Sequence, residues 1–125
     1  MSLPESLSQS LEDYLEAILC IERRQGSVRS IDVARHLDVS KPSVSHAMKK
    51  LCLAGHLRMA HDHSLHLTAS GRAIAESIDE RHHYFRDRLI AAGVDPVLAE
   101  HDACQLEHAL SPESFAKLKE MLEKQ

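Results

Sequence analysis

The pattern of apolar residues along the chain predicts a mainly helical protein. Between Leu7 and Gly26, apolar residues recur at intervals of three and four, the spacing of one face of an α-helix. This stripe consists of Leu7, Leu11, Leu15, Ile18 and Leu19. Because glycine commonly ends helices, the first helix is expected to stop at Gly26.

Two shorter helical segments follow, joined by a tight turn at Asp38-Val39. Ser30 can cap the first segment and Ser40 the second, with Pro42 in a first turn where its missing N–H costs little. The apolar residues expected to face inward are Ile31, Ala34 and Leu37 in the first segment and Val44, Ala47, Met48 and Leu51 in the second. Two short helices with polar side chains outward on the second are typical of a helix–turn–helix.

The segment HLRMAHDHSLHLT predicts a β-hairpin directly after this pair. Its two short runs, 56–60 and 64–68, flank a turn at Asp62-His63. A hairpin that follows the second helix of a helix–turn–helix is a wing.

The rest of the chain again shows helical patterns. A long helix is expected from Thr68 to Gly93, with Ile74, Ile78, Phe85 and Leu89 as its apolar stripe. His82 lies near that stripe, whereas His83 points about a hundred degrees away. Asp-Pro at 95–96 and Ser-Pro at 111–112 each combine a cap with a first-turn proline, which predicts helices over 97–110 and 113–125.

Charge separates the middle of the chain from its flanks, although the net charge is −4. Residues 1–28 carry two positive and five negative side chains, 29–72 carry seven and three, and 73–125 carry six and eleven. A basic middle segment suits contact with phosphates. Together with the helix–turn–helix and the wing, it predicts DNA binding.

Other features limit the location of the protein. No stretch of 18 apolar residues is present, so no membrane span is expected. The N-terminus lacks the basic start and apolar region of a signal peptide. The chain has an odd number of cysteines, Cys20, Cys52 and Cys104, and their spacing is not typical of disulfides. This suits a reducing compartment. A cytoplasmic protein is therefore expected.

The segment CQLEH places three good metal ligands at i, i+3 and i+4. On a helix, Cys104, Glu107 and His108 would share one face. This spacing alone fits a metal site, a fragment of an active site, or three unrelated side chains. Asp13 and Glu16 are likewise three apart on the first helix, where they also fit a solvated acidic face.

The order of these motifs resembles a known family. EDYLEAI, a winged helix–turn–helix, ERHH, and DACQLEH before ALSPE resemble the diphtheria toxin repressor and manganese transport regulator family, over about residues 8–122. The resemblance implies a mainly α fold, with a winged helix–turn–helix DNA-binding domain over 1–72 and an all-helical metal-binding and dimerisation domain over 73–125. It further implies a metal-dependent transcriptional repressor rather than an enzyme. Such a protein binds palindromic operator DNA as a homodimer and has no small organic substrate.

The resemblance also implies the functional residues. The metal ligands would be Asp13, Glu16, His82, Cys104, Glu107 and His108. For Cys20 and His101 we prefer a core or surface role. Residues matching family positions near base edges are Ser40, Pro42 and His46. Those placed for phosphate contact are Ser43, Ser45, Lys49 and Lys50, with Arg29 as a further candidate. Lys41 belongs to the same DNA-binding set. The two adjacent lysines also fit a solvated face.

This chain departs from both branches of the family. Manganese-type members carry a carboxylate at the position of Cys104, and iron-type members carry a methionine at that of Asp13. Iron-type members have a second site that uses a carboxylate where this chain has Arg86. Because a thiolate raises affinity for later metals over Mn²⁺, Fe²⁺ is the first expectation, then Mn²⁺, with Zn²⁺, Co²⁺ and Ni²⁺ open.

Two other functions fit parts of the sequence. A metallohydrolase would explain CxxEH, but its acid and imidazole groups are all used as ligands and no oxyanion element is visible. A winged-helix regulator that does not depend on metal would explain the N-terminal half alone.

Overall fold

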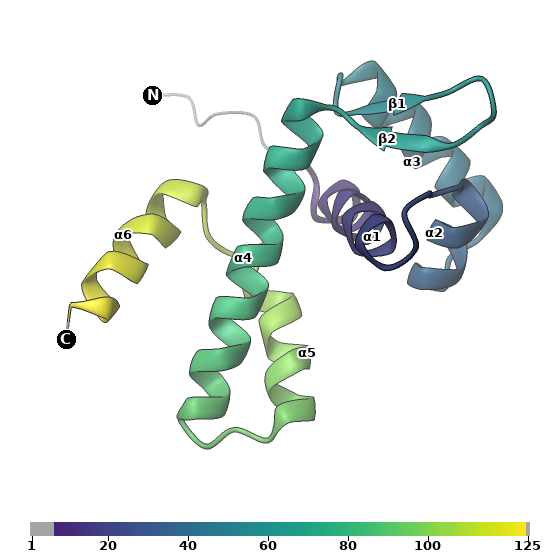
Figure 1. Ribbon diagram of the computed structural model, residues 1–125. Coiled ribbons are helices and arrows are strands. Elements are labelled where there is room, and N and C mark those ends of the chain that lie inside the picture. The colour runs from purple at the N-terminus through teal and green to yellow at the C-terminus, as the bar shows by residue number, and fades with distance from the viewer. Residues whose placement is uncertain (1–6, 125) are drawn as a thin grey trace. The chain divides into compact units, whose positions relative to one another are not determined.

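The computed structural model describes residues 7–124. The segment MSLPES, on which part of the signal-peptide analysis rested, and Gln125 lie outside the described residues. The elements are α1 (Gln9–Gln25), α2 (Ser30–Leu37), α3 (Lys41–Leu53), β1 (Leu57–Met59), β2 (Leu65–Leu67), α4 (Ala69–Ala91), α5 (Pro96–Leu106) and α6 (Pro112–Glu123), as labelled in Figure 1. The predicted mainly helical fold is confirmed.

The chain divides into two compact units, Met1–Glu76 and Ser77–Gln125. The domain boundary predicted from sequence, between residues 72 and 73, stays a prediction. None of the helices in the described part of the chain is long and apolar enough to cross a membrane.

Local hydrogen bonds set the ends of the first helices. The hydroxyl of Ser8 accepts the N–H of Leu11 and starts α1, which ends at Gly26 with a φ of 87°. α2 begins one residue earlier than expected, because the carboxylate of Asp32 accepts the N–H of Arg29 at 2.9 Å. The prediction that Ser30 caps this helix was therefore wrong.

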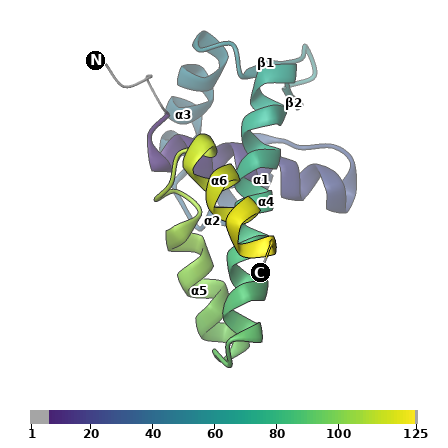
Figure 2. The ribbon, with the colours of Figure 1, turned by 90° about the vertical axis from the view of Figure 1, so that its left-hand side faces the viewer.

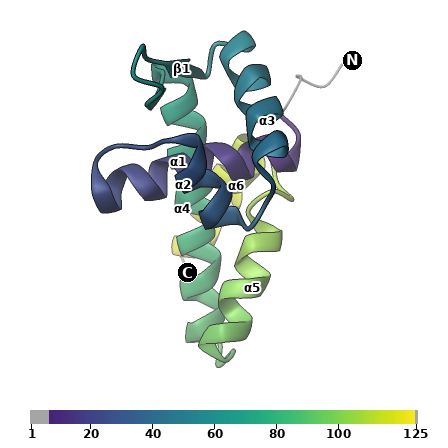
Figure 3. The same ribbon diagram turned by 90° about the vertical axis from the view of Figure 1, so that its right-hand side faces the viewer.

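The helix–turn–helix closes over an apolar core shared by α1, α2 and α3 (Figure 3). On α3 the predicted inward residues Val44, Ala47, Met48 and Leu51 are all buried. On α2 the most buried side chain is Val33, at 0% exposure, which was absent from the predicted inward set. The turn into α3 passes through Asp38 with a φ of 54°, a left-handed conformation that aspartate tolerates better than most residues.

The wing forms as predicted, with shorter strands. The two strands lie side by side above the helices of this unit (Figures 1 and 2). They pair antiparallel, with Leu57 opposite Leu67 and Met59 opposite Leu65. In the connecting turn, Asp62 Oδ1 accepts the N–H and the hydroxyl of Ser64, at 3.0 and 2.6 Å. These hydrogen bonds hold the pKa of Asp62 below its usual value.

The start of α4 is fastened to the turn before the wing. The hydroxyl of Thr68 donates to the carbonyl of Gly55 at 2.7 Å. A Cβ at Gly71 would overlap the carbonyl oxygen of His56, so only glycine fits this approach. Arg72 pairs with Glu22 of α1 at 2.7 Å.

The second unit contains the rest of α4 with α5 and α6. α5 runs beside α4 (Figures 1 and 3). The rings of Tyr84, Phe85 and Phe115 make edge contacts with centroids 5.4–5.9 Å apart, which pack α6 against α4.

α5 ends at Leu106, although the sequence predicted a helix to residue 110. Two features of the chain beyond Leu106 explain why the helix ends there. The guanidinium of Arg81 donates to the carbonyl of Leu110 at 2.6 Å, and Ser111 is extended ahead of Pro112. Glu107 and His108 therefore lie in a turn that continues from the helix.

Candidate metal centre and DNA-binding face

The imidazole of His82 lies between two carboxylates. Its Nδ1 lies 2.7 Å from Glu107 Oε2, and its Nε2 lies 2.7 Å from Glu100 Oε1. The sulfur of Cys104 lies 3.8 Å from Nδ1. The position of His82 on α4 thus brings it to the CQLEH segment at the end of α5.

Glu107 joins the two histidines of this cluster. Its N–H donates to the carbonyl of Ala103 at 3.0 Å, which places its side chain just past the last turn of α5. One carboxylate oxygen faces His82, and the other lies 3.2 Å from His108 Nε2. Glu107 is only 1% exposed, so this carboxylate has little access to water.

The donor set fits a divalent transition metal. Two imidazoles, a thiol and a buried carboxylate supply nitrogen, sulfur and oxygen ligands, whereas Ca²⁺ and Mg²⁺ prefer oxygen alone. A buried carboxylate also requires a compensating positive charge, which a divalent ion would supply. Side-chain donor atoms of His82, Cys104 and the neighbouring Glu100 all lie within 4.8 Å of one another.

Glu100 was missed by the sequence analysis. It lies four residues before Cys104, so it shares the same face of α5, and this spacing was visible in the sequence. The signal was weak, because exposed glutamates are common on helices. Its contact with His82, at 2.7 Å, and the proximity of Arg86, at 3.8 Å, distinguish Glu100 from a solvated side chain.

The other predicted ligands belong to the N-terminal unit. Asp13 and Glu16 lie on α1, and both are half-buried. As metal ligands they stay a prediction. In the C-terminal unit, His101 is exposed, and His83 points to Asp79 at 3.6 Å rather than to the cluster.

The predicted DNA-contacting residues share one property, which is exposure to solvent. They are Arg29, Ser40, Lys41, Pro42, Ser43, Ser45, His46, Lys49 and Lys50. The hydroxyl of Ser40 already accepts the N–H of Ser43 and donates to its Oγ at 2.9 Å. Ser40 is therefore occupied as a helix cap, and Ser43 keeps a hydroxyl hydrogen for a phosphate. Contact of this face with DNA stays a prediction.

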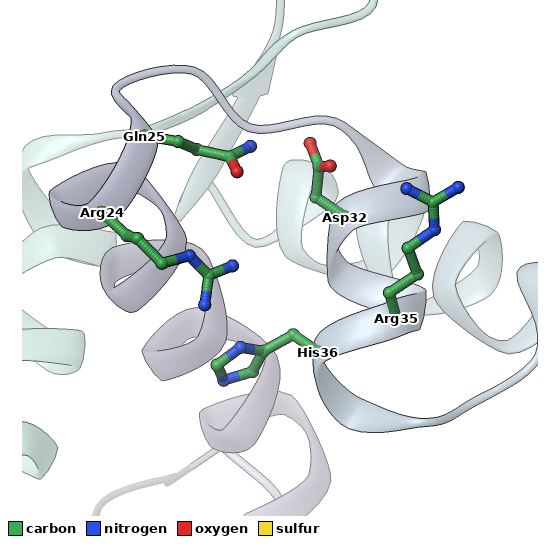
Figure 4. A pocket seen from close by; sticks show the side chains of 5 residues that line it. All are labelled: Arg24, Gln25, Asp32, Arg35 and His36. Carbon is green, nitrogen blue, oxygen red and sulfur yellow. The ribbon is translucent and has the colours of Figure 1, made fainter.

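A polar cavity of about 320 Å³ lies between α1 and α2, lined by Arg24, Gln25, Asp32, Arg35 and His36 (Figure 4). It contains none of the predicted site residues. Arg24 reaches from α1 toward α2, and the ring of His36 reaches back toward α1. Burial and the charge of Arg24 lower the pKa of His36 from its usual value.

A winged helix–turn–helix followed by a helical unit with clustered metal-ligating side chains defines a metal-dependent transcriptional regulator. Residues 6–65 match the iron dependent repressor N-terminal DNA binding domain. Residues 68–125 match the metal binding and dimerisation domain of the same family. The chain belongs to the iron dependent repressor family, and the family resemblance and fold class predicted from sequence are confirmed.

The chain matches its relatives over different fractions of their length. The transcriptional regulator MntR of Escherichia coli O6:H1 is 35% identical over 84% of this chain and 68% of its own. An uncharacterized HTH-type regulator of Methanocaldococcus jannaschii is 34% identical over 94% of this chain and 96% of its own. The structure of the manganese regulator SloR matches with a TM-score of 0.76 and 26% identity, over 90% of this chain. The chain spans 53% of SloR, about half its length.

Proposed function

We propose that this protein represses transcription by binding operator DNA as a homodimer when it is loaded with a divalent transition metal. The observation that carries this proposal is the cluster of His82, Cys104, Glu107 and His108 in the C-terminal unit. It supplies a nitrogen, sulfur and oxygen donor set in a family of metal-dependent repressors. Family membership supports a regulatory activity of this kind over that of an enzyme acting on a small organic substrate.

Six residues would hold the ion in this proposal. His82, Cys104, Glu107 and His108 come from the C-terminal unit, and Asp13 and Glu16 would add two carboxylates from α1. A bound divalent cation would supply the positive charge that lets these carboxylates lie close together. Without it, the mutual repulsion of these carboxylates would oppose their assembly around one site. This dependence would link DNA binding to metal, with a coupling of about 1–3 kcal/mol.

The exposed face of α3 would read the operator. His46 and Pro42 would lie near base edges, while Ser43, Ser45, Lys49 and Lys50 would contact phosphates. Lys49→Ala should weaken binding to specific and random DNA alike and reduce the salt slope by about 0.9. His46→Ala should instead relax sequence choice. If both variants kept the wild-type salt slope and specificity, α3 would not be the helix that contacts DNA.

Exposed apolar side chains on α5 support a homodimer. Val97 is 80% exposed and Leu98 is 52% exposed, which is unusual for adjacent apolar residues on one helix. Phe115, by contrast, is buried within the chain against Tyr84 and Phe85. We expect a dimer in sedimentation at micromolar concentration with metal present, and a shift toward monomer in Val97→Asp.

Cys104 makes Fe²⁺ the first candidate, with Mn²⁺ next and Zn²⁺, Co²⁺ and Ni²⁺ after them. Against this order, the related SloR is described as a manganese regulator. The thiol of Cys104 is a soft ligand, which favours metals later than Mn²⁺.

The proposal is tested by DNA binding across a panel of divalent metals. The probe is a duplex selected from a random pool with Fe²⁺ under anaerobic conditions, and the selection is repeated with Mn²⁺. Binding should require metal and should be lost with a chelator. Equal binding with and without metal would favour the alternative, a winged-helix regulator independent of metal. Hydrolysis of peptide or ester substrates by the Zn²⁺-loaded protein would instead support an enzyme.

A further inference from the structure

Glu100 has a contact that the ligand set does not require. It lies on α5, one turn before Cys104, and its side chain is 52% exposed. Despite this exposure, its Oε1 lies 2.7 Å from His82 Nε2. His82 therefore has a carboxylate at each ring nitrogen.

The two ring nitrogens of His82 face different surroundings. The Nδ1 side holds the carboxylate of Glu107 at 2.7 Å and the sulfur of Cys104 at 3.8 Å. The Nε2 side holds Glu100. A histidine that binds metal through one nitrogen usually donates the N–H of the other to a carboxylate, which fixes the tautomer and orients the ring.

Arg86 favours an orienting role for Glu100 over direct ligation. Its guanidinium lies 3.8 Å from Glu100 Oε2 and 3.1 Å from Asp87 Oδ1. A cation at this distance attracts the second carboxylate oxygen away from any ion on the Nδ1 side of His82. Arg86 and His82 thus hold the two oxygens of Glu100 separately.

We propose that Glu100 is a positioning residue that binds His82 Nε2–H and so presents Nδ1 to the metal beside Cys104 and Glu107. Arg86 holds Glu100 in this orientation. The inference rests on the proposed function, because it assigns a role within the same metal centre. It makes Nδ1 the ligand atom of His82 and excludes Glu100 from the set of ligands.

The first test measures Co²⁺ affinity of the full chain. Glu100→Ala should weaken Co²⁺ binding about 10-fold or more, the usual cost of losing such an outer partner. Glu100→Gln should stay within about 3-fold of the wild type, because its amide oxygen still accepts the Nε2–H. Arg86→Gln should have a smaller effect than Glu100→Ala. Glu113→Ala, which removes an exposed carboxylate on α6, is the matched control and should change nothing.

The second test measures the exchange of the His82 ring N–H with water by NMR. In the Co²⁺-loaded protein labelled with ¹⁵N-histidine, the His82 N–H should give a paramagnetically shifted signal assigned to Nε2. Its exchange with water should be slow in the wild type and Glu100→Gln, and fast in Glu100→Ala. A residue that only supported the fold would leave this exchange unchanged.

Three results would overturn the inference. Glu100→Gln losing as much affinity as Glu100→Ala, with altered Co²⁺ absorption bands, would make Glu100 a direct ligand. Wild-type affinity and exchange in Glu100→Ala would leave Glu100 without a role. A wild type that does not bind Co²⁺, or whose Co²⁺ spectrum is unaffected by Cys104→Ala, would overturn the proposed centre itself.

Discussion

The two units of this protein bury different kinds of side chain. In the N-terminal unit, the fully buried residues are aliphatic, with Leu15, Ile18, Leu19, Ile21 and Leu51 all at 0% exposure. In the C-terminal unit, Ile78 and two alanines are buried at that level, beside the ionisable Arg81, His82 and Glu107. The first unit is a conventional apolar core, and the second encloses charge.

The kind of side chain that each unit buries determines how strongly its stability should depend on metal. Burial of aliphatic side chains contributes about 1.5–3 kcal/mol each, whatever the ionic conditions. Buried ionisable groups stabilise a fold only while their charges are compensated. The N-terminal unit should therefore fold without metal, even if Asp13 and Glu16 also bind the ion, whereas the stability of the C-terminal unit should depend more strongly on metal.

Leu51→Ala should destabilise the N-terminal unit by about 2–5 kcal/mol, because it leaves a cavity in the apolar core. The loss should be the same with and without metal. Amide hydrogen exchange in residues 7–76 measures it. Leu53→Ala removes the same atoms from an 89% exposed position on α3 and should change stability by less than about 0.5 kcal/mol. A loss that depends on metal would remove the contrast between the units.

Cys104→Ala should abolish most of the stabilisation that metal gives to the C-terminal unit. A ligand at 100 times its Kd stabilises the folded state by about 2.7 kcal/mol, so a 100-fold weaker site loses most of this amount. Co²⁺ should also lose its near-ultraviolet sulfur charge-transfer band. Cys104→Glu should shift preference toward Mn²⁺.

Cys20→Ala, at a half-buried position on α1, is the control for the loss of a thiol. An identical Co²⁺ spectrum and metal ranking in wild type and Cys104→Ala would exclude Cys104 from the site. The remaining residues would then have to bind metal without sulfur.

Gly71→Ala should destabilise the N-terminal unit by about 1–3 kcal/mol, because the added methyl group overlaps the backbone of His56. The effect should again be independent of metal. Thermal unfolding with and without Co²⁺ measures it, and Glu76→Ala, at an exposed position of α4, serves as the control. A Gly71→Ala protein as stable as the wild type would mean that the turn at Gly55-His56 shifts to accommodate the added methyl group without loss of stability.

His36 should produce the smallest effect, a loss of N-terminal stability in acid. Its pKa is lowered by burial and by Arg24, so the unfolded chain takes up this proton at a higher pH than the folded one. The free energy of unfolding should therefore fall as pH drops below the ordinary value of 6.5, and the fall should end below the folded pKa. His36→Gln should flatten this part of the curve.

His61→Gln, in the exposed turn of the wing, is the matched control for His36. Urea unfolding between pH 5 and 8, followed by hydrogen exchange in α1 and α2, separates the two variants. The same slope in His36→Gln and the wild type would assign the acid sensitivity to another group.

Local signals predicted the N-terminal unit well and the C-terminal unit less well. The inward face of α3 and the wing follow from apolar spacing and turn residues that neighbour one another in sequence. The end of α5 does not, because Arg81 sets it from 29 positions away through the carbonyl of Leu110. The same holds for Glu100, whose spacing from Cys104 was readable but whose contact with His82 depends on how α4 packs against α5.

Because α5 ends within the CQLEH segment, the ligands before and after that end differ in how far they can move to fit ions of different size. Cys104 lies within α5, and the N–H of Glu107 still donates to the carbonyl of Ala103 in that helix. Helical hydrogen bonds therefore hold the backbone at both residues, which would not shift to suit an ion of different radius. His108 lies in the turn, where small dihedral changes move its ring. Adjustment between a larger ion such as Mn²⁺ and a smaller one would therefore fall on residues 108–110. Arg81, by donating to the carbonyl of Leu110 at 2.6 Å, would limit how far that turn could open around a bound ion.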